Sequence, residues 1–217
     1  MDKVILIGGG QQSRVVLYNL KAQNKYSAAC IAEVDKSKAG TYVEDVLVEP
    51  FDNFSVESMR VLEEKYQTNK FFISFGNMKY RKKVFEFLVE NGWHAINIIH
   101  PDAVVSPTAI IGNGVLIEAG CLVTPSPKIG DNVVVNTGSQ VNHDNIIESH
   151  VYIASGVVLS GGVTIGENTL LDDGVIVTLG HKVGKNSLIG AGAVVTKDIP
   201  DNVVAFGAPC RVIRNNE

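Results

Sequence analysis

Cysteine is scarce in this 217-residue sequence, which contains only Cys30, Cys121 and Cys210. An odd number of widely separated cysteines offers neither a disulfide framework nor the paired spacing of a zinc site. We expect three reduced and mostly buried thiols, because free cysteine usually packs as a small hydrophobic residue. The histidines and carboxylates show no ligand spacing on a common face, so we expect no metal.

Long apolar runs and a surplus of positive charge are also missing. No stretch reaches the roughly 18 apolar residues of a membrane span. The opening MDKVILIGGG passes straight into a strand-like run without the features of a signal peptide. The net charge is −4, whereas nucleic-acid-binding proteins usually carry clustered Lys and Arg. We therefore expect a cytoplasmic protein that binds neither membrane nor nucleic acid.

The first part of the chain alternates short apolar runs with helix-like segments. The apolar runs span 4–8, 28–33 and 71–76, and the helix-like segments span about 12–23, 55–67 and 81–92. Buried strands that alternate with amphipathic helices are typical of parallel βαβ units. Residues 1–97 are therefore predicted to form a small Rossmann-like α/β domain.

The second part follows a different period, because an aliphatic residue recurs at every sixth position. These positions are Ile99, Val105, Ile111, Ile117, Val123, Ile129, Val135, Val141, Ile147, Ile153, Leu159, Ile165, Leu171, Val177, Val183, Ile189 and Val195. Neither an α-helix nor a single strand produces this spacing, so the repeat must belong to a larger structural unit. The period predicts a parallel β-helix.

Three such hexads make one coil of the predicted β-helix. Phrases of the kind IGNGV recur at 111–115, 129–133, 165–169 and 183–187, which are spaced by 18 or 36 residues. Gly and Asn at the corners supply the left-handed backbone conformations that sharp turns need. We expect about five coils, with the tail IPDNVVAFGAPCRVIR as a cap, because a solenoid cannot close its own ends. The predicted domain spans 98–217.

Several phrases carry a resemblance to known proteins. The hexad repeat resembles that of left-handed β-helix acyltransferases, which use acyl-CoA and form trimers with active sites between subunits. More narrowly, the chain resembles bacterial N-acetyltransferases of nucleotide-linked 4-amino-4,6-dideoxysugars and the related sialic-acid O-acetyltransferase-like proteins. The phrases that carry this likeness are the Gly-rich N-terminal turn, IIHPDAVVSPTAIIGNGVLI (98–117), NTGSQVNHDNII (136–147) and GAGAVVTKDIPDNVVAFGAPCRVI (190–213).

The resemblance covers nearly the whole chain and implies a fold, a reaction and an assembly. It implies an α/β Rossmann-like domain that binds a nucleotide sugar, followed by a left-handed parallel β-helix that carries the acyltransferase chemistry. It also implies a homotrimer, acetyl-CoA as co-substrate, and a place in surface glycan biosynthesis such as that of lipopolysaccharide O-antigen.

The resemblance implies a catalytic pair at His143 and Asp144. A protonated amine has no lone pair to attack a thioester, and histidine, with an ordinary pKa of about 6.5, can accept its proton at neutral pH. A neighbouring carboxylate holds the ring and stabilises the imidazolium. The alternative is that His143 is an ordinary corner histidine on a solvated turn. It stands four residues before the inward Ile147 and therefore off the aliphatic core, so packing does not require a histidine there.

The same likeness places the acetyl donor along the coils. It implies that a backbone N–H at Gly161 stabilises the oxyanion, that the pantetheine lies beside Gly161 and Gly162, and that the adenine end lies near Ala191, Gly192 and the GAPCR tail. A family histidine that contacts the cofactor aligns with Tyr152, which can donate a hydrogen bond but carries no positive charge. His181 stands two residues before an inward valine, at a position that a small residue or a valine usually holds in this chain. The sequence does not explain why a histidine is found there.

The glycine turn follows a strand and enters a helix, where N–H groups and the helix dipole can receive a phosphate. It is a poor dinucleotide fingerprint, since the third glycine would fall at Ser13, and no Lys-Ser/Thr pair of an ATPase loop follows. The resemblance implies contacts with the sugar nucleotide at Gly8, Gly9, Gly10, Gln11, Gln12, Asp35, Lys36, Asn77 and Asn136, with Glu33 a weaker candidate. Gln11 and Gln12 replace the family's usual Gly-His.

Several alternatives stay open. The nucleotide could be UDP, GDP or dTDP, and Asp35 and Asn77 could be ordinary strand-end turn residues. The acceptor could be a sugar hydroxyl, as in sialic-acid O-acetylation, because His143 would serve that reaction too. A non-catalytic solenoid that binds a nucleotide sugar needs none of His143, Asp144 and Gly161, so their joint presence favours an enzyme.

Overall fold

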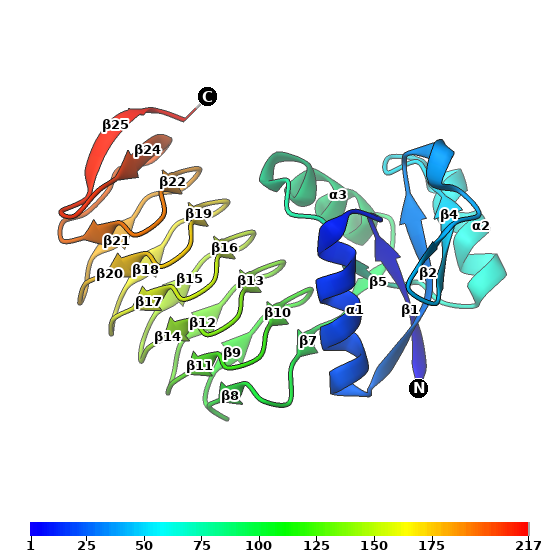
Figure 1. Ribbon diagram of the computed structural model, residues 1–217, viewed down its shortest axis with the longest axis horizontal. Coiled ribbons are helices and arrows are strands. Elements are labelled where there is room, and N and C mark those ends of the chain that lie inside the picture. The colour runs from blue at the N-terminus through cyan, green and yellow to red at the C-terminus, as the bar shows by residue number, and fades with distance from the viewer. Residues whose placement is uncertain (217) are drawn as a thin grey trace. The chain divides into compact units, whose positions relative to one another are not determined.

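The computed structural model describes residues 1–216, which form two compact units (Figure 1). The first unit comprises Met1–Ile98, and the second begins at Ile99. Residue 217, the last residue of the predicted second domain, lies outside the described residues. Within residues 1–216, no helix combines the length and the apolar character that crossing a bilayer requires.

The first unit is built on a six-stranded sheet of order β3-β4-β2-β1-β5-β6. All neighbours are parallel except β3 and β4. The strands are β1 (Asp2–Ile7), β2 (Tyr26–Glu33), β3 (Tyr42–Val43), β4 (Val46–Pro50), β5 (Lys70–Ile73) and β6 (His94–Ala95). The helices are α1 (Gln11–Gln23), the 3-10 turn η1 (Lys36–Lys38), α2 (Val56–Tyr66) and α3 (Met78–Glu90).

The predicted parallel α/β arrangement is confirmed, with β1, β2 and β5 at the three predicted apolar runs. One face of the sheet, with Ile5 and Phe71, packs on Leu62 of α2 and Leu88 of α3. The prediction missed β3 and β6, which have two residues each, and β4, whose short apolar run ends in Glu49 and Pro50. It also started the third helix too late, because the Asn77 side chain accepts the Tyr80 N–H and begins α3 at Met78.

The second unit is a left-handed parallel β-helix with three sheets along its sides (Figure 1). The first side carries β7 (Ile98–Ile99), β10 (Leu116–Ile117), β13 (Val134–Val135), β16 (Tyr152–Ile153), β19 (Leu170–Leu171) and β22 (Leu188–Ile189). The second carries β8 (Val104–Val105), β11 (Leu122–Val123), β14 (Gln140–Val141), β17 (Val158–Leu159), β20 (Ile176–Val177) and β23 (Val194–Val195). The third carries β9 (Ile110–Ile111), β12 (Lys128–Ile129), β15 (Ile146–Ile147), β18 (Thr164–Ile165) and β21 (Lys182–Val183).

The coil period follows from the strand register. Gln140 pairs with Val158, Ile146 with Thr164, and Tyr152 with Leu170, so each coil advances by 18 residues. At the corner before the first side, one column of residues adopts positive φ, including Asn132, His150 and Asn168. The predicted three-hexad coil and the predicted left-handed corners are therefore confirmed.

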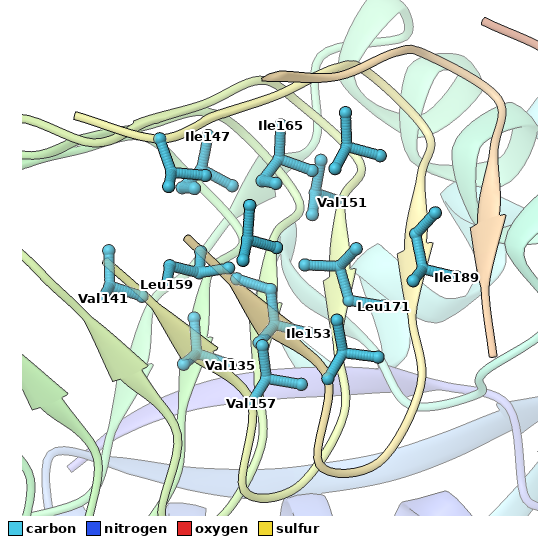
Figure 2. Close-up of a cluster of buried hydrophobic side chains, with 14 of the residues drawn as sticks. Val135, Val141, Ile147, Val151, Ile153, Val157, Leu159, Ile165, Leu171 and Ile189 are labelled. Carbon is cyan, nitrogen blue, oxygen red and sulfur yellow. The ribbon is translucent and has the colours of Figure 1, made fainter. Parts of the chain in front are cut away.

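The core of the β-helix is the sixth-position aliphatic series. From Ile117 to Val195 every member of the series is buried, and Figure 2 shows labelled members such as Ile153 and Leu159 together in the interior. The side chain two residues before most members of this series also points inward. At some coils this residue is polar and forms hydrogen bonds with a neighbouring coil. Ser139, for example, donates to the Ala154 carbonyl at 2.8 Å and accepts the Val157 N–H.

The C-terminal segment continues the first side of the β-helix. β24 (Val203–Phe206) pairs in parallel with β22, and β25 (Arg211–Asn215) turns back antiparallel to β24. Cys210 is buried at this end, and Cys30 and Cys121 are buried elsewhere, all three as free thiols. The predicted burial of the cysteines is thus confirmed, and burial raises the pKa of Cys30 to about 12.

Candidate active site

The His143–Asp144 pair lies at the corner between β14 and β15. Val141 and Ile147 point into the core on either side of it, so the coil continues while the corner faces outward. His143 Nδ1 lies 2.9 Å from Asp144 Oδ2, and the two side chains are 60% and 68% exposed. An ionised carboxylate can only accept, so this contact favours the neutral tautomer that has its proton on Nδ1 and a lone pair on Nε2.

Gly161 occupies the position one coil beyond His143, and the ring lies against it. A Cβ atom added to Gly161 would overlap Nε2 and Cε1 of the His143 ring. The backbone ladder holds the two coils together here, because the Gly162 N–H donates to the His143 carbonyl at 2.9 Å. The Gly161 carbonyl accepts the Gly180 N–H, whereas the Gly161 N–H donates no hydrogen bond within residues 1–216. A backbone donor is therefore available beside the proposed base.

Four other predicted residues lie elsewhere on the coils. Asn136, Ala191 and Gly192 lie at the corner between the first and second sides, and Tyr152 lies on the outer face of β16 on the first side. Gly162, by contrast, shares the corner of His143. A single β-helix therefore brings His143, Asp144, Gly161 and Gly162 together, but not the remaining four.

A second His–Asp pair accounts for His181, whose presence the sequence alone did not explain. The His181 ring turns to Asp198, with Nδ1 3.2 Å from Oδ1, instead of filling the interior. Asp198 also accepts the Lys182 N–H at 2.9 Å. The hydrogen bonds from Lys182 and His181 lower the pKa of Asp198. The pair therefore joins the start of β21 to the segment that follows β23, in the last turn of the β-helix.

The glycine turn of the first unit is tied to the end of β2. Gly8 adopts a positive φ of 104°, and a Cβ there would overlap the Phe75 ring. The Gly9 N–H donates to Glu33 Oε2 at 2.7 Å, and the Asp35 N–H donates to Glu33 Oε1 at 3.1 Å. Glu33 is buried, so its carboxylate serves the turn itself. Gly10 is the N-cap of α1, which Gln11 and Gln12 open.

A cleft of about 490 Å³ opens beside this turn. It is lined by Gly8, Gly10, Ala32, Glu33, Val34, Asp52, Asn53, Phe54, Phe75, Asn77 and Tyr80. Of the predicted contacts, the cleft thus includes Gly8, Gly10 and Asn77. Gly9, Gln11 and Gln12 belong to the same turn but are not among the lining residues.

Asp35 and Lys36 also lie outside the cleft lining. Asp35 caps η1 and accepts the Ser37 hydroxyl at 2.6 Å and the Ser37 N–H at 3.0 Å. These hydrogen bonds hold the pKa of Asp35 below its usual value. The side chain is thus engaged in its own turn, and Lys36 is an exposed residue of η1.

Sequence reasoning missed Asp52, Asn53, Phe54 and Tyr80, whereas Phe75 belongs to the phrase FGN (75–77), which was expected to lie at a ligand crevice. The first three follow β4, a strand that the sequence did not predict, and Phe75 was included in a predicted strand that in fact ends at Ile73. One sequence feature could have indicated these residues: the polar pair Asp52-Asn53 stands between an apolar run and a predicted helix.

Comparison with known proteins now identifies the chain. No protein-family model matches it. It is similar to a histidine-to-asparagine mutant of perosamine N-acetyltransferase from Caulobacter crescentus in complex with CoA and GDP-perosamine, with 32% identity, a TM-score of 0.90, and coverage of 99% of this chain and 98% of that one. It is also similar to the acetyltransferase domain of PglB from Neisseria gonorrhoeae in complex with acetyl coenzyme A, with 30% identity, a TM-score of 0.85, and coverage of 97% and 98%.

A third structure, WeeI from Acinetobacter baumannii, matches with a TM-score of 0.81 over 97% of this chain and all of that one (100%), and its 22% identity supports the fold alone. The β-helix, together with the full-length similarity to these acetyltransferases, identifies the chain as an acyltransferase. More narrowly, the chain belongs to the hexapeptide-repeat nucleotide-sugar acetyltransferases.

Proposed function

We propose that the protein transfers the acetyl group of acetyl-CoA to the 4-amino group of a nucleotide-linked 4-amino-4,6-dideoxysugar. The observation that carries this proposal is the exposed His143–Asp144 pair packed on Gly161, within a chain similar over its full length to a perosamine N-acetyltransferase. That similarity supports an amine as the acceptor in preference to a hydroxyl.

In the proposed reaction His143 Nε2 removes a proton from the sugar ammonium group. The amine nitrogen then attacks the thioester carbonyl carbon, and the Gly161 N–H donates to the oxygen on which negative charge develops. The C–S bond breaks after the C–N bond has formed, the imidazolium returns its proton to the departing thiolate, and the second proton of the former ammonium group is released to solvent as the neutral amide forms. Asp144 holds the ring and stabilises the imidazolium.

The direct test measures acetyl transfer by the purified protein. It uses acetyl-CoA with UDP-, GDP- and dTDP-linked 4-amino-4,6-dideoxysugars, and with the hydroxyl counterpart of each sugar at equal concentration. We expect turnover on an amino sugar and little on its hydroxyl counterpart. Absence of turnover on all three amino sugars would refute the proposal, and faster turnover on a hydroxyl sugar would replace it with O-acetylation.

Asp144→Asn tests the role of the carboxylate. An asparagine amide can donate to Nδ1 and stabilise the tautomer whose Nε2 is protonated, which cannot act as the base. We expect kcat to fall about 10-fold to 100-fold in steady-state assays, less than for a buried pair because Asp144 is exposed. Asp144→Asn should lower kcat no further in a His143→Ala background, because the two residues act as a unit. Additive losses would contradict the pairing.

The complete active site, for both the acetyl donor and the sugar, is proposed to form between copies of the chain in a homotrimer. His143 lies at one corner of a coil, and Asn136, Ala191 and Gly192 lie at another, so a second copy is needed to bring the two sets together. The outer face of the second side is aliphatic at five of its positions. They are Val104, Leu122, Val158, Ile176 and Val194. Val104 is 65% exposed and Ile176 is 39% exposed, which suits an intersubunit face.

Ile176→Asp tests this assembly. A carboxylate at the centre of an apolar interface would be buried without a partner, so we expect sedimentation velocity to show dissociation and the assay to show loss of transfer. Thr164→Asp, on the outer face of the neighbouring third side, is the matched control and should leave the assembly intact. A wild-type monomer, or an Ile176→Asp variant that sediments as the wild type does, would contradict the proposal.

In this proposal the first unit holds the sugar nucleotide, with Gly8, Gly9, Gly10, Gln11, Gln12 and Asn77 nearest to it, and Tyr152 contacts the donor. The product would serve a pathway to a surface glycan such as lipopolysaccharide O-antigen. A cytoplasmic location fits the three free cysteines, because thiols stay reduced in that compartment.

A further inference from the structure

The cleft of the first unit has a charge pattern that bears on the nucleotide. Among the described residues that line it, none is a lysine or an arginine, whereas Glu33 and Asp52 are carboxylates. A pyrophosphate is poorly matched to the part of the cleft that carries these two carboxylates, because like charges repel. An uncharged base with hydrogen-bond donors is a better match.

Asp52 is the carboxylate with capacity left for a ligand. Both oxygens of Glu33 accept backbone N–H groups, and Lys38 Nζ lies 3.7 Å from Glu33 Oε2. Asp52 accepts only the Phe54 N–H, at 3.1 Å, among the contacts of the described residues. Its own N–H donates to Ser58 Oγ at 3.3 Å, which fixes its place in the loop between β4 and α2. A carboxylate has about four acceptor positions, so most of those on Asp52 are open.

Aromatic side chains stand beside Asp52 and can stack on a base. Phe54 is 47% exposed and Tyr80 is 54% exposed, and both line the cleft with Phe75. Phe54 is held by an edge contact with Phe87, whose ring centroid is 5.6 Å away. Every base has a π-face that can stack on such rings, so stacking supplies affinity and the hydrogen bonds decide which base is bound.

The bases differ in what they offer a carboxylate. Guanine presents two adjacent donors, N1–H and the 2-amino group, which match two carboxylate oxygens. Uracil and thymine present one N–H between two carbonyl oxygens, which a carboxylate repels. We propose that Asp52 selects guanine in this cleft, so that the acceptor is a GDP-linked sugar. This inference rests on the proposed function and names its substrate class.

Calorimetric titration of the full-length protein with free nucleotides tests the selection. We expect GDP to bind about 10-fold or more tightly than UDP or dTDP, and IDP, which lacks the 2-amino group, to bind more weakly than GDP. In Asp52→Asn, GDP should bind about 10-fold more weakly, and XDP should bind more tightly than it does to the wild type, because the amide can donate to the C2 carbonyl. Asp45→Asn removes an exposed carboxylate outside the cleft and should leave the order of affinities unchanged.

Three results would overturn the selection by Asp52: UDP or dTDP binding as tightly as GDP, an Asp52→Asn variant that weakens GDP, UDP and dTDP equally, or no gain for XDP. The acetyl-transfer assay separates this inference from the proposed function. Turnover confined to a UDP- or dTDP-linked sugar would overturn the guanine selection and leave N-acetylation standing. A GDP preference without transfer to any sugar would overturn the proposed function alone.

Discussion

Replacing His143 by alanine is expected to lower kcat for acetyl transfer by about 10³-fold, within the range observed for loss of a general base. Without the imidazole, the sugar amine stays protonated near neutral pH and cannot attack the thioester. Because the side chain is 60% exposed and the hexad core passes on either side of it, we expect the thermal midpoint to change little. Steady-state kinetics and a thermal melt of the same preparation measure both quantities.

Two further variants sharpen this result. His143→Gln keeps a polar side chain of similar reach but cannot accept and return a proton, so its kcat should be as low as that of His143→Ala. His94→Ala removes an exposed histidine of β6 and should retain wild-type kcat. Activity in His143→Ala that approaches the wild-type value would exclude the proposed base.

Gly161→Ala is expected to lower kcat by about 10²-fold. The added methyl group would occupy the space of the His143 ring at Nε2 and Cε1, so the ring must rotate away from the acceptor amine. The outward histidine can move into solvent, and therefore the fold should lose little stability. We expect a low kcat and a nearly unchanged midpoint of urea unfolding.

Gly166→Ala is the matched control for this variant. A Cβ there would overlap the backbone of Gly184 and Lys185, which cannot rotate away as a side chain can. The expected pattern is the opposite one: stability falls by about 1–3 kcal/mol, the usual range for overpacking, while the folded protein keeps its kcat. Equal effects of the two alanines on kcat would show that Gly161 has no special relation to His143.

The β-helix could be predicted from sequence because its rule is local and repeated. Every coil meets the same packing requirement, so an aliphatic residue at each sixth position, such as Leu159 or Ile165, reports the period directly. The first unit was predicted less completely. β6 has only two residues, and the pairing of both β4 and β6 depends on neighbours distant in the chain.

The candidate site likewise contains residues that the sequence predicted and residues that only the structure revealed. His143 and Asp144 are adjacent in sequence, so their pairing could be predicted from the NHD phrase and from the family resemblance. Asp35 was a reasonable prediction at the end of β2, but its Oδ1 accepts both the N–H and the hydroxyl of Ser37. The cleft depends instead on Asp52, Phe54 and Tyr80, which come from loops and a helix start that carry no periodic signal.

The sequence alone was enough to determine the two-part organisation, the coil length and the outward His–Asp corner, because each follows from short-range spacing. Only the tertiary structure decided that the His143 ring lies against Gly161, which the resemblance had placed near the thioester, and that Asp52 lines the same cleft as the glycine turn. Both facts are contacts between segments separated by a coil or more of chain. Such contacts are set by how coils and strands stack in three dimensions.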